Sequence, residues 1–269
     1  MTSVGDGVAM TALGVVGAFV LGLLLGSFAN VLIHRIPQGL SIVSPPSACP
    51  SCGSRIKARH NVPVLGWLVL RGRCADCSEP ISWRYPLVEL GTGLAFAATA
   101  WWNGLDWTLP LLLALVYFGI VLTVIDLEQR RLPDPLTLAF GISVGVGILT
   151  VSIGTGDWSG ALRALIGAAA LGGLYLIAFI VYPRGMGFGD VKLAPSLGAL
   201  LGLIGWPALV VGGFAAFLWG AIAGVVAMAR ARRGRGVAIP FGPWMFAGAV
   251  TGILIGPAVS GWYLEMVGL

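Results

Sequence analysis

The chain has 269 residues, of which 57% are hydrophobic and only 10% are charged. A water-soluble domain usually carries about 25% charged residues, so this composition excludes an ordinary soluble protein. Long apolar runs without strand-like alternation exclude a β-barrel and predict an all-α polytopic membrane protein in a lipid bilayer. The net charge of +5 is attributed to cytoplasmic loops, where membrane proteins gather basic residues, so no nucleic-acid partner is expected.

The apolar runs predict about eight transmembrane helices, since roughly 20 apolar residues cross a bilayer. They cover residues 8–33, 87–102, 108–125, 135–153, 161–182, 193–205, 207–229 and 243–263. The first run is interpreted as a permanent helix, because no Lys or Arg precedes it as in a secretory signal. The sixth run is short, so the sequence leaves open whether it spans fully or forms a re-entrant hairpin with the seventh.

The distribution of basic residues predicts the orientation of the chain. With the N-terminus outside, segments 34–86, 126–134, 183–192 and 230–242 lie on the inner side. These segments hold every Lys and Arg except Arg163, including Arg184, Arg232, Arg233 and Arg235. Because basic loops stay on the cytoplasmic side, we expect an N-out, multi-pass protein.

Four cysteines lie in the single long polar segment, residues 34–86. Cys49 and Cys52 form one C-x2-C pair, Cys74 and Cys77 form a second, and 21 residues separate the two pairs. Two such pairs favour a structural, four-thiolate Zn²⁺ site, which would stabilise a segment too short to bury much core. Disulfides are the alternative, but they need an oxidising compartment. A redox C-x-x-C role is less favoured, because no βαβ pattern surrounds the motif.

Two carboxylates, Asp126 and Asp190, lie at predicted inner ends of apolar helices. Asp190 follows Gly187 and Gly189, which permit close backbone approach, for example by an extended substrate strand. Lys192 either balances the charge of Asp190 or marks the inner face. Asp134 follows Pro133 and is interpreted as a cap of the next helix.

Carboxylates at a membrane boundary are costly unless they are paired or lie in a polar cavity. Two neighbouring carboxyls can share one proton, so that one activates water and the other polarises a carbonyl. This chemistry cleaves peptide bonds and favours an intramembrane aspartic protease using Asp126 and Asp190. A proton- or ion-coupled transporter using the same residues is the main alternative, and a catalytically silent zinc-binding scaffold is a third.

Several short segments together resemble the bacterial type IV prepilin peptidases, the bifunctional leader peptidase/N-methyltransferases of the GxGD aspartic protease group. The segments are 26–37, 49–52, 61–63, 70–74 with Cys77, 81–89, 126–134, 185–193 and 239–243. Their joint order and spacing cover nearly the whole chain. The resemblance implies a first transmembrane helix over 1–33, a cytoplasmic zinc-binding segment over 34–86 and a seven-helix protease core over 87–269.

The resemblance also implies the activity. Asp126 and Asp190 correspond to the catalytic pair, with Gly187, Gly189 and Lys192 in supporting positions. The expected substrates are type IV prepilins or type II secretion pseudopilins, cleaved before their hydrophobic stem at the cytoplasmic face of the bacterial inner membrane. Because the four-cysteine segment is present, we also expect N-methylation of the new N-terminal residue with S-adenosylmethionine. No residues are assigned to the methyl donor, and the oligomeric state is left open.

Overall fold

The structure, a computed structural model, describes residues 3–183, 185–231 and 239–267, and these ranges contain only helices, turns and two isolated β-bridges. Arg184, Arg232, Arg233 and Arg235, which contributed to the predicted orientation, lie outside the described residues. The predicted all-α fold is therefore confirmed for the part of the chain that is described. The chain divides into two compact units, Met1–Val121 and Leu122–Leu269.

The first unit contains the N-terminal helices and the cysteine segment. Its helices are α1 (Ser3–Arg35), α2 (Leu65–Val69), α3 (Arg84–Asn103) and the first part of α4 (Leu109–Gln129), with 3-10 turns at Ile36–Gln38 and Ala58–His60. Helices α1 and α3 pack closely, because glycine removes the side chain where their backbones meet. A Cβ atom on Gly26 would lie 2.7 Å from the Cα atom of Glu89.

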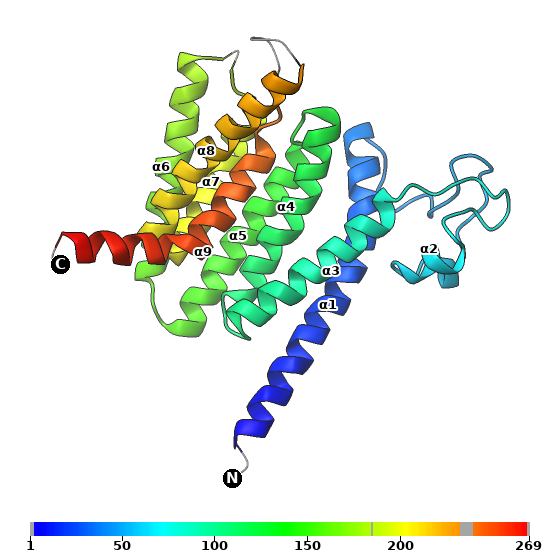
Figure 1. The fold of residues 1–269 in the computed structure, drawn as a ribbon, viewed down its shortest axis with the longest axis horizontal. Helices are drawn as coiled ribbons and strands as arrows, with labels where there is room; N and C mark the ends of the chain where they lie inside the picture. Colours follow the sequence, from blue (N-terminus) through cyan, green and yellow to red (C-terminus); the bar gives the residue numbers. More distant parts are fainter. Residues whose placement is uncertain (1–2, 184, 232–238, 268–269) are drawn as a thin grey trace. The chain divides into compact units, whose positions relative to one another are not determined.

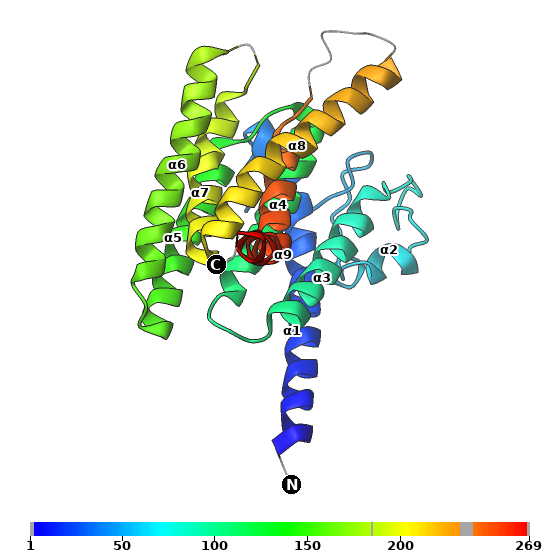
Figure 2. The same cartoon turned by 60° about the vertical axis from the view of Figure 1, so that its left-hand side comes forward.

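The second unit contains the end of α4 and five further helices. They are α5 (Asp134–Thr155), α6 (Ser159–Val181), α7 (Phe188–Ile204), α8 (Trp206–Ala231) and α9 (Gly242–Met266). Figures 1 and 2 both show α6 beside α7, and α8 beside α9. Gly167 of α6 faces Gly198 of α7 so closely that a Cβ on Gly167 would lie 2.3 Å from the Gly198 carbonyl oxygen. The small glycine residues thus let these membrane helices approach each other closely, as the abundance of glycine in the sequence indicates.

Each of the eight predicted apolar runs corresponds to one long helix and extends beyond it by at most one residue. Among the described residues, six helical stretches are long and apolar enough to cross a membrane: Thr11–Gln38, Leu109–Gln129, Asp134–Thr155, Ser159–Val181, Trp206–Ala231 and Gly242–Met266. The chain is accordingly a multi-pass membrane protein. Helices α3 and α7 do not meet the same criteria, so eight crossings stay a prediction.

A boundary difference that bears on the site concerns α7. The apolar run predicts a start at residue 193, whereas the helix starts at Phe188, directly after an extended Gly187. Asp190 therefore lies in the first turn of a helix rather than in a loop before it. An acidic side chain is stabilised at this position, because the backbone N–H groups of a first turn carry partial positive charge.

Candidate functional site

Asp126 lies in the last turn of α4, in the second unit. The helix ends at Gln129, and Arg130 then adopts a left-handed conformation with φ 53°. Apolar neighbours cover this turn, so that Asp126 is only 4% exposed. A buried carboxylate of this kind needs a hydrogen-bond partner.

The partner of Asp126 comes from a segment 116 residues away. The backbone N–H of Gly242 donates to Oδ2 of Asp126 at 3.0 Å. Gly242 is the first residue of α9, where backbone N–H groups have no partner within the helix and the helix dipole attracts negative charge. A Cβ on Gly242 would lie 2.8 Å from this same oxygen, so a side chain at this position would displace the carboxylate.

Asp190 is the third residue of α7 and is 7% exposed. Its side chain folds back over the start of the helix, where a Cβ on Gly187 would lie 3.3 Å from Oδ2 of Asp190. Asp190 lies outside the six candidate membrane spans. Burial, and then the negative charge of Asp126, raise the pKa of Asp190 to about 7, although a backbone hydrogen bond from Gly187 lowers it in part.

One side chain, Leu132, contacts the backbone beside both acids. A Cβ on Gly189 would lie 3.0 Å from the Cβ of Leu132, and a Cβ on Gly242 would lie 3.2 Å from its Cδ2. Leu132 is itself buried, at 9% exposure. The end of α4, the start of α7 and the start of α9 therefore meet around one leucine, which brings Asp126 and Asp190 into one site.

Lys192 contacts Asp134, whereas the sequence analysis considered Asp190 as its partner. Its Nζ lies 2.7 Å from Oδ1 of Asp134, at the start of α5, and 5.0 Å from the ring centroid of Phe188. Both charged side chains are substantially exposed. Asp134 is the first residue of α5, and its carboxylate accepts a hydrogen bond from Lys192. Lys192 thus links the starts of α5 and α7.

An aromatic cluster supports the turn before Gly242. The rings of Tyr175, Phe217 and Phe241 pack against one another at centroid distances of 5.3 to 6.1 Å. Tyr175 is 2% exposed and close enough to Asp190 for the charge of the carboxylate to act on it. Phe241 and Gly242 belong to segment 239–243, which the sequence analysis singled out. Tyr175 lies in a uniformly apolar run, where no sequence pattern distinguishes it.

The geometry suits chemistry that needs one shared proton. Asp126 receives an N–H donor and a helix N-terminus, both of which favour its charged form, whereas its burial opposes that form. Burial and the charge of Asp126 raise the pKa of Asp190 to about 7 despite its backbone hydrogen bond from Gly187, so a large fraction of Asp190 is protonated near neutral pH. Two carboxyls in environments this different can act as a base and an acid in the same reaction.

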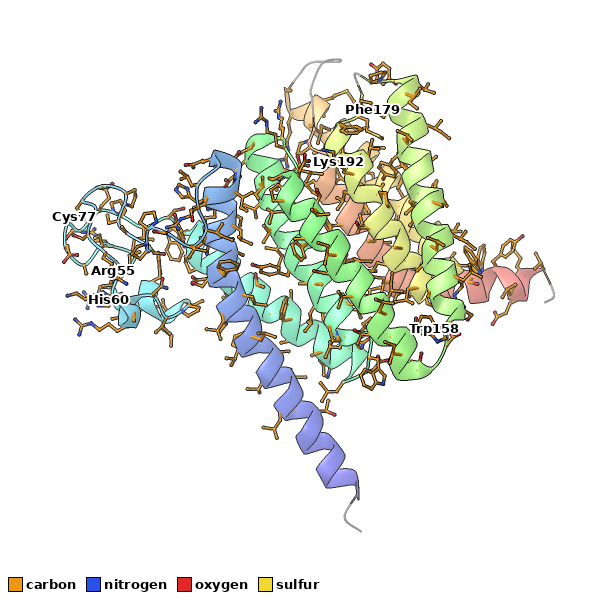
Figure 3. All side chains as sticks on the ribbon, turned by 180° about the vertical axis from the view of Figure 1, so that it is seen from behind. Arg55, His60, Cys77, Trp158, Phe179 and Lys192 are labelled. Carbon is orange, nitrogen blue, oxygen red and sulfur yellow. The ribbon has the colours of Figure 1, made fainter. Side chains whose placement is uncertain are left out.

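The cysteine segment of the first unit contains two turns of matching structure. Gly53 donates to the carbonyl of Cys49 at 2.9 Å, and Ser78 donates to the carbonyl of Cys74 at 3.0 Å. Both donors adopt left-handed conformations, with φ 72° and φ 63°. Figure 3 shows Cys77, Arg55 and His60 in this segment. Each C-x2-C pair therefore forms a knuckle that turns two thiols toward the other knuckle.

The four thiols are free and form one cluster. All four sulfur atoms lie within 4.8 Å of one another, with Cys49 and Cys77 at 3.8 Å and Cys52 and Cys74 at 4.0 Å. A tetrahedral zinc site with Zn–S distances of about 2.3 Å requires sulfur separations of about 3.8 Å. Side-chain and backbone hydrogen bonds from Ser54 lower the pKa of Cys52 to about 6, whereas desolvation and the neighbouring thiols raise the pKa of Cys77. The cluster therefore fits one tetrahedral metal ion.

Two family models match the chain. The bacterial peptidase A24 N-terminal domain matches residues 20–103, which include the four cysteines. The type IV leader peptidase family matches residues 113–225, which include Asp126 and Asp190.

Curated relatives match over almost their full length. Proteins named prepilin leader peptidase/N-methyltransferase are similar to this chain in Stutzerimonas stutzeri, at 33% identity over 94% of both chains, and in Aeromonas hydrophila, at 35% over 91% and 92%. The protein of the same name from Neisseria gonorrhoeae is 36% identical over 92% of this chain and 88% of its own. No solved structure matches the chain significantly. These relatives favour the peptidase over the transporter alternative, to which they give no support.

Proposed function

The chain belongs to the type IV leader peptidase family, and we propose that it cleaves the leader peptides of type IV prepilins and pseudopilins with Asp126 and Asp190. It then N-methylates the new N-terminal residue with S-adenosylmethionine. The observation that carries the protease assignment is the meeting of these two buried carboxyls around Leu132, each at the end of a different helix. The names of the relatives support both activities.

The two carboxyls take different roles in this proposal. Asp126 is the ionised member, because the Gly242 N–H and the start of α9 stabilise its charge. It removes a proton from the attacking water. Asp190 is the protonated member, because burial and the charge of Asp126 raise its pKa to about 7. It donates a hydrogen bond to the scissile carbonyl, which stabilises the negative charge that develops on the carbonyl oxygen.

Gly187 and Gly189 act as supports of the site. The absence of a side chain on Gly189 lets Leu132 reach the start of α7, and Gly187 leaves room for the Asp190 carboxyl. The glycines thereby fix the position of Asp190 in addition to any role in receiving an extended substrate. Lys192 supports the site by holding the start of α7 to Asp134.

The four cysteines hold a structural Zn²⁺ in this proposal. The spacing of their sulfur atoms supports a closed, four-thiolate site, which leaves no position for a substrate and therefore stabilises the segment rather than catalyses. The domain division follows: a first helix over 1–33, a cytoplasmic zinc-binding segment over 34–86 and a seven-helix protease core over 87–269.

We also propose the full topology. The chain crosses the bacterial inner membrane eight times with its N-terminus outside. The C-terminal end of α4 and the start of α7 therefore face the cytoplasm. The basic residues of the predicted inner segments support this orientation, because such residues remain on the cytoplasmic side. A prepilin with a cytoplasmic leader would then reach Asp126 and Asp190 without crossing the membrane.

Membranes that contain the full chain test this function directly. A prepilin is incubated with them and with S-adenosylmethionine, and the products are analysed by mass spectrometry. The proposal expects release of the leader and a mature chain heavier by one methyl group at its N-terminus. An intact prepilin, together with pH-dependent solute flux in vesicles, would instead favour the transporter.

A further inference from the structure

A second group of buried polar side chains lies in the first unit, where α1 and α3 meet in antiparallel register. A Cβ on Gly22 would lie 2.8 Å from the Cα of Gly93, and a Cβ on Gly26 would lie 2.7 Å from the Cα of Glu89. One turn further along α1, Nδ2 of Asn30 donates to the Tyr85 carbonyl at 3.1 Å. Asn30 and Glu89 therefore lie about 6 Å apart along the helix axes, one turn from each other in the same seam.

Glu89 is a buried carboxylate with capacity for a further ligand. It is 9% exposed, and its Oε2 accepts the backbone N–H of Val64 at 2.7 Å. The hydroxyl of Ser27 lies near this carboxylate and can serve as a second donor. A carboxylate has about four lone-pair sites, so these two donors do not saturate it.

Val64, the donor to Glu89, has a backbone conformation that β-branched residues avoid. Its φ is 61° and its ψ is −50°, at the N-terminus of α2. Such a conformation costs on the order of 1–3 kcal/mol and persists where the surroundings enforce it, often at functional sites. The strain points the Val64 N–H at the carboxylate, which fixes the position of Glu89.

Asn30 has a buried acceptor without a partner. The residue is 4% exposed, and its Oδ1 accepts no hydrogen bond within the described part of the chain. Leaving such an atom unpaired costs about 1–3 kcal/mol, so this arrangement needs a reason. A ligand that donates hydrogen bonds would satisfy Oδ1 and the remaining lone pairs of Glu89 together.

Both open positions are acceptors, and one of them is a carboxylate. They repel anions and suit a compact donor with several N–H groups, which is an amine. We propose that Asn30 and Glu89 bind the N-terminal α-amine of the cleaved substrate during methyl transfer, an inference that rests on the methyltransferase activity proposed above. Asn30 would accept one N–H, and Glu89 would accept a second.

The proposed roles account for each bond and proton in the methyl-transfer reaction. S-adenosylmethionine supplies the methyl group: a new N–C bond forms as the S–C bond of the sulfonium breaks. The amine nitrogen must present a free electron pair, and an α-amine has a pKa near 8, so it loses a proton at neutral pH only with help. Glu89 takes up this proton from the nitrogen, and Asn30 orients the remaining N–H group.

The test uses the full-length protein with the conservative change Glu89→Gln. Glutamine keeps an acceptor for the Val64 N–H but cannot take up a proton. Loss of a general base typically lowers a rate about 100-fold or more, so methyl transfer should fall by that factor while leader cleavage is unchanged. Asn30→Leu, which keeps the branched shape but removes the oxygen together with the Nδ2 donor to Tyr85, should also lower methyl transfer selectively. Glu79→Gln, the same change at an exposed acid of this unit, is the matched control.

A binding measurement separates this inference from the function it rests on. A soluble peptide with an N-terminal phenylalanine is titrated against the purified protein, with its amine either free or acetylated. The wild type should bind the free amine about 10-fold more tightly, as charge-assisted hydrogen bonds predict, and Glu89→Gln should lose this preference. A variant that methylates like the wild type, or keeps the preference, overturns the inference. Parallel loss of cleavage and zinc in both variants also overturns it, because it indicates a structural role. A wild type that prefers the free amine but never methylates refutes the methyltransferase proposal alone.

Discussion

The backbone N–H of Gly242 donates a 3.0 Å hydrogen bond to the carboxylate of Asp126, across 116 residues of chain. The bond joins the end of α4 to the start of α9, and it gives segment 239–243 a physical role. Phe241 is held by Tyr175 and Phe217, so the aromatic cluster fixes the donor. The reactivity of one acid therefore depends on a residue that carries no side chain.

Gly242→Ala should lower cleavage without unfolding the protein. The new methyl group would lie 2.8 Å from Oδ2 of Asp126, so the carboxylate must move. Displacements of about 1 Å can cost about 100-fold in rate, and we expect a fall in kcat of that order. Gly173→Ala is the matched control, because a Cβ at Gly173 meets nothing within 4 Å. Equal activity of the two variants would argue against a role for the Gly242 contact.

Asp190→Asn should stabilise the protein in a pH-dependent way. Because burial raises the pKa of Asp190 from 3.8 to about 7, the folded chain loses stability as pH rises through this interval. Asparagine does not titrate, so the advantage of the variant should be small near pH 4 and grow to at most about 4 kcal/mol above pH 7. Thermal unfolding of the wild type and the variant in detergent, at acidic and alkaline pH, measures this difference in stability. Asp157→Asn is the control: hydrogen bonds from Ser159 lower the pKa of this exposed acid, so its replacement should give no such gain in stability. A stability difference between Asp190→Asn and the wild type that does not change with pH would contradict the burial argument.

The sequence predicted both acids as site residues, but it did not predict the contacts that hold them together. Asp126 and Asp190 stood out because charge is rare in apolar helices, and the four cysteines stood out by spacing. The start of α7 was predicted five residues late, because Phe188–Lys192 mixes glycine and charge, which apolar periodicity cannot recognise as helix. Tyr175 and Leu132 were missed since nothing distinguishes them from their apolar neighbours until long-range contacts form.

The Lys192–Asp134 ion pair should contribute little to stability. Its side chains are 38% and 70% exposed, so water screens the attraction across 2.7 Å. Exposed pairs contribute about 0–1 kcal/mol. A double-mutant cycle with Lys192→Met and Asp134→Asn, followed by thermal unfolding, should give a coupling energy in this range. A coupling of several kcal/mol would contradict this expectation, because it would show that water does not screen the pair.

The purified protein should contain about one zinc ion per chain, as a four-thiolate site requires. Cys77→Ser removes one ligand, so metal analysis should find the zinc lost and methyl transfer reduced. His60→Ala lies in the same segment but outside the sulfur cluster, and it should keep the metal. A folded, metal-free wild type with disulfides between the knuckle cysteines would refute the zinc site.

Prepilin cleavage by single asparagine variants tests the aspartate pair most directly. Asp126→Asn and Asp190→Asn keep the shape of each side chain and remove its ability to exchange a proton, and Asp157→Asn serves as the control. Leader release is followed in membranes with equal amounts of each protein. The account predicts that both site variants lose cleavage while the control retains it. Wild-type cleavage by either site variant would contradict the catalytic pair.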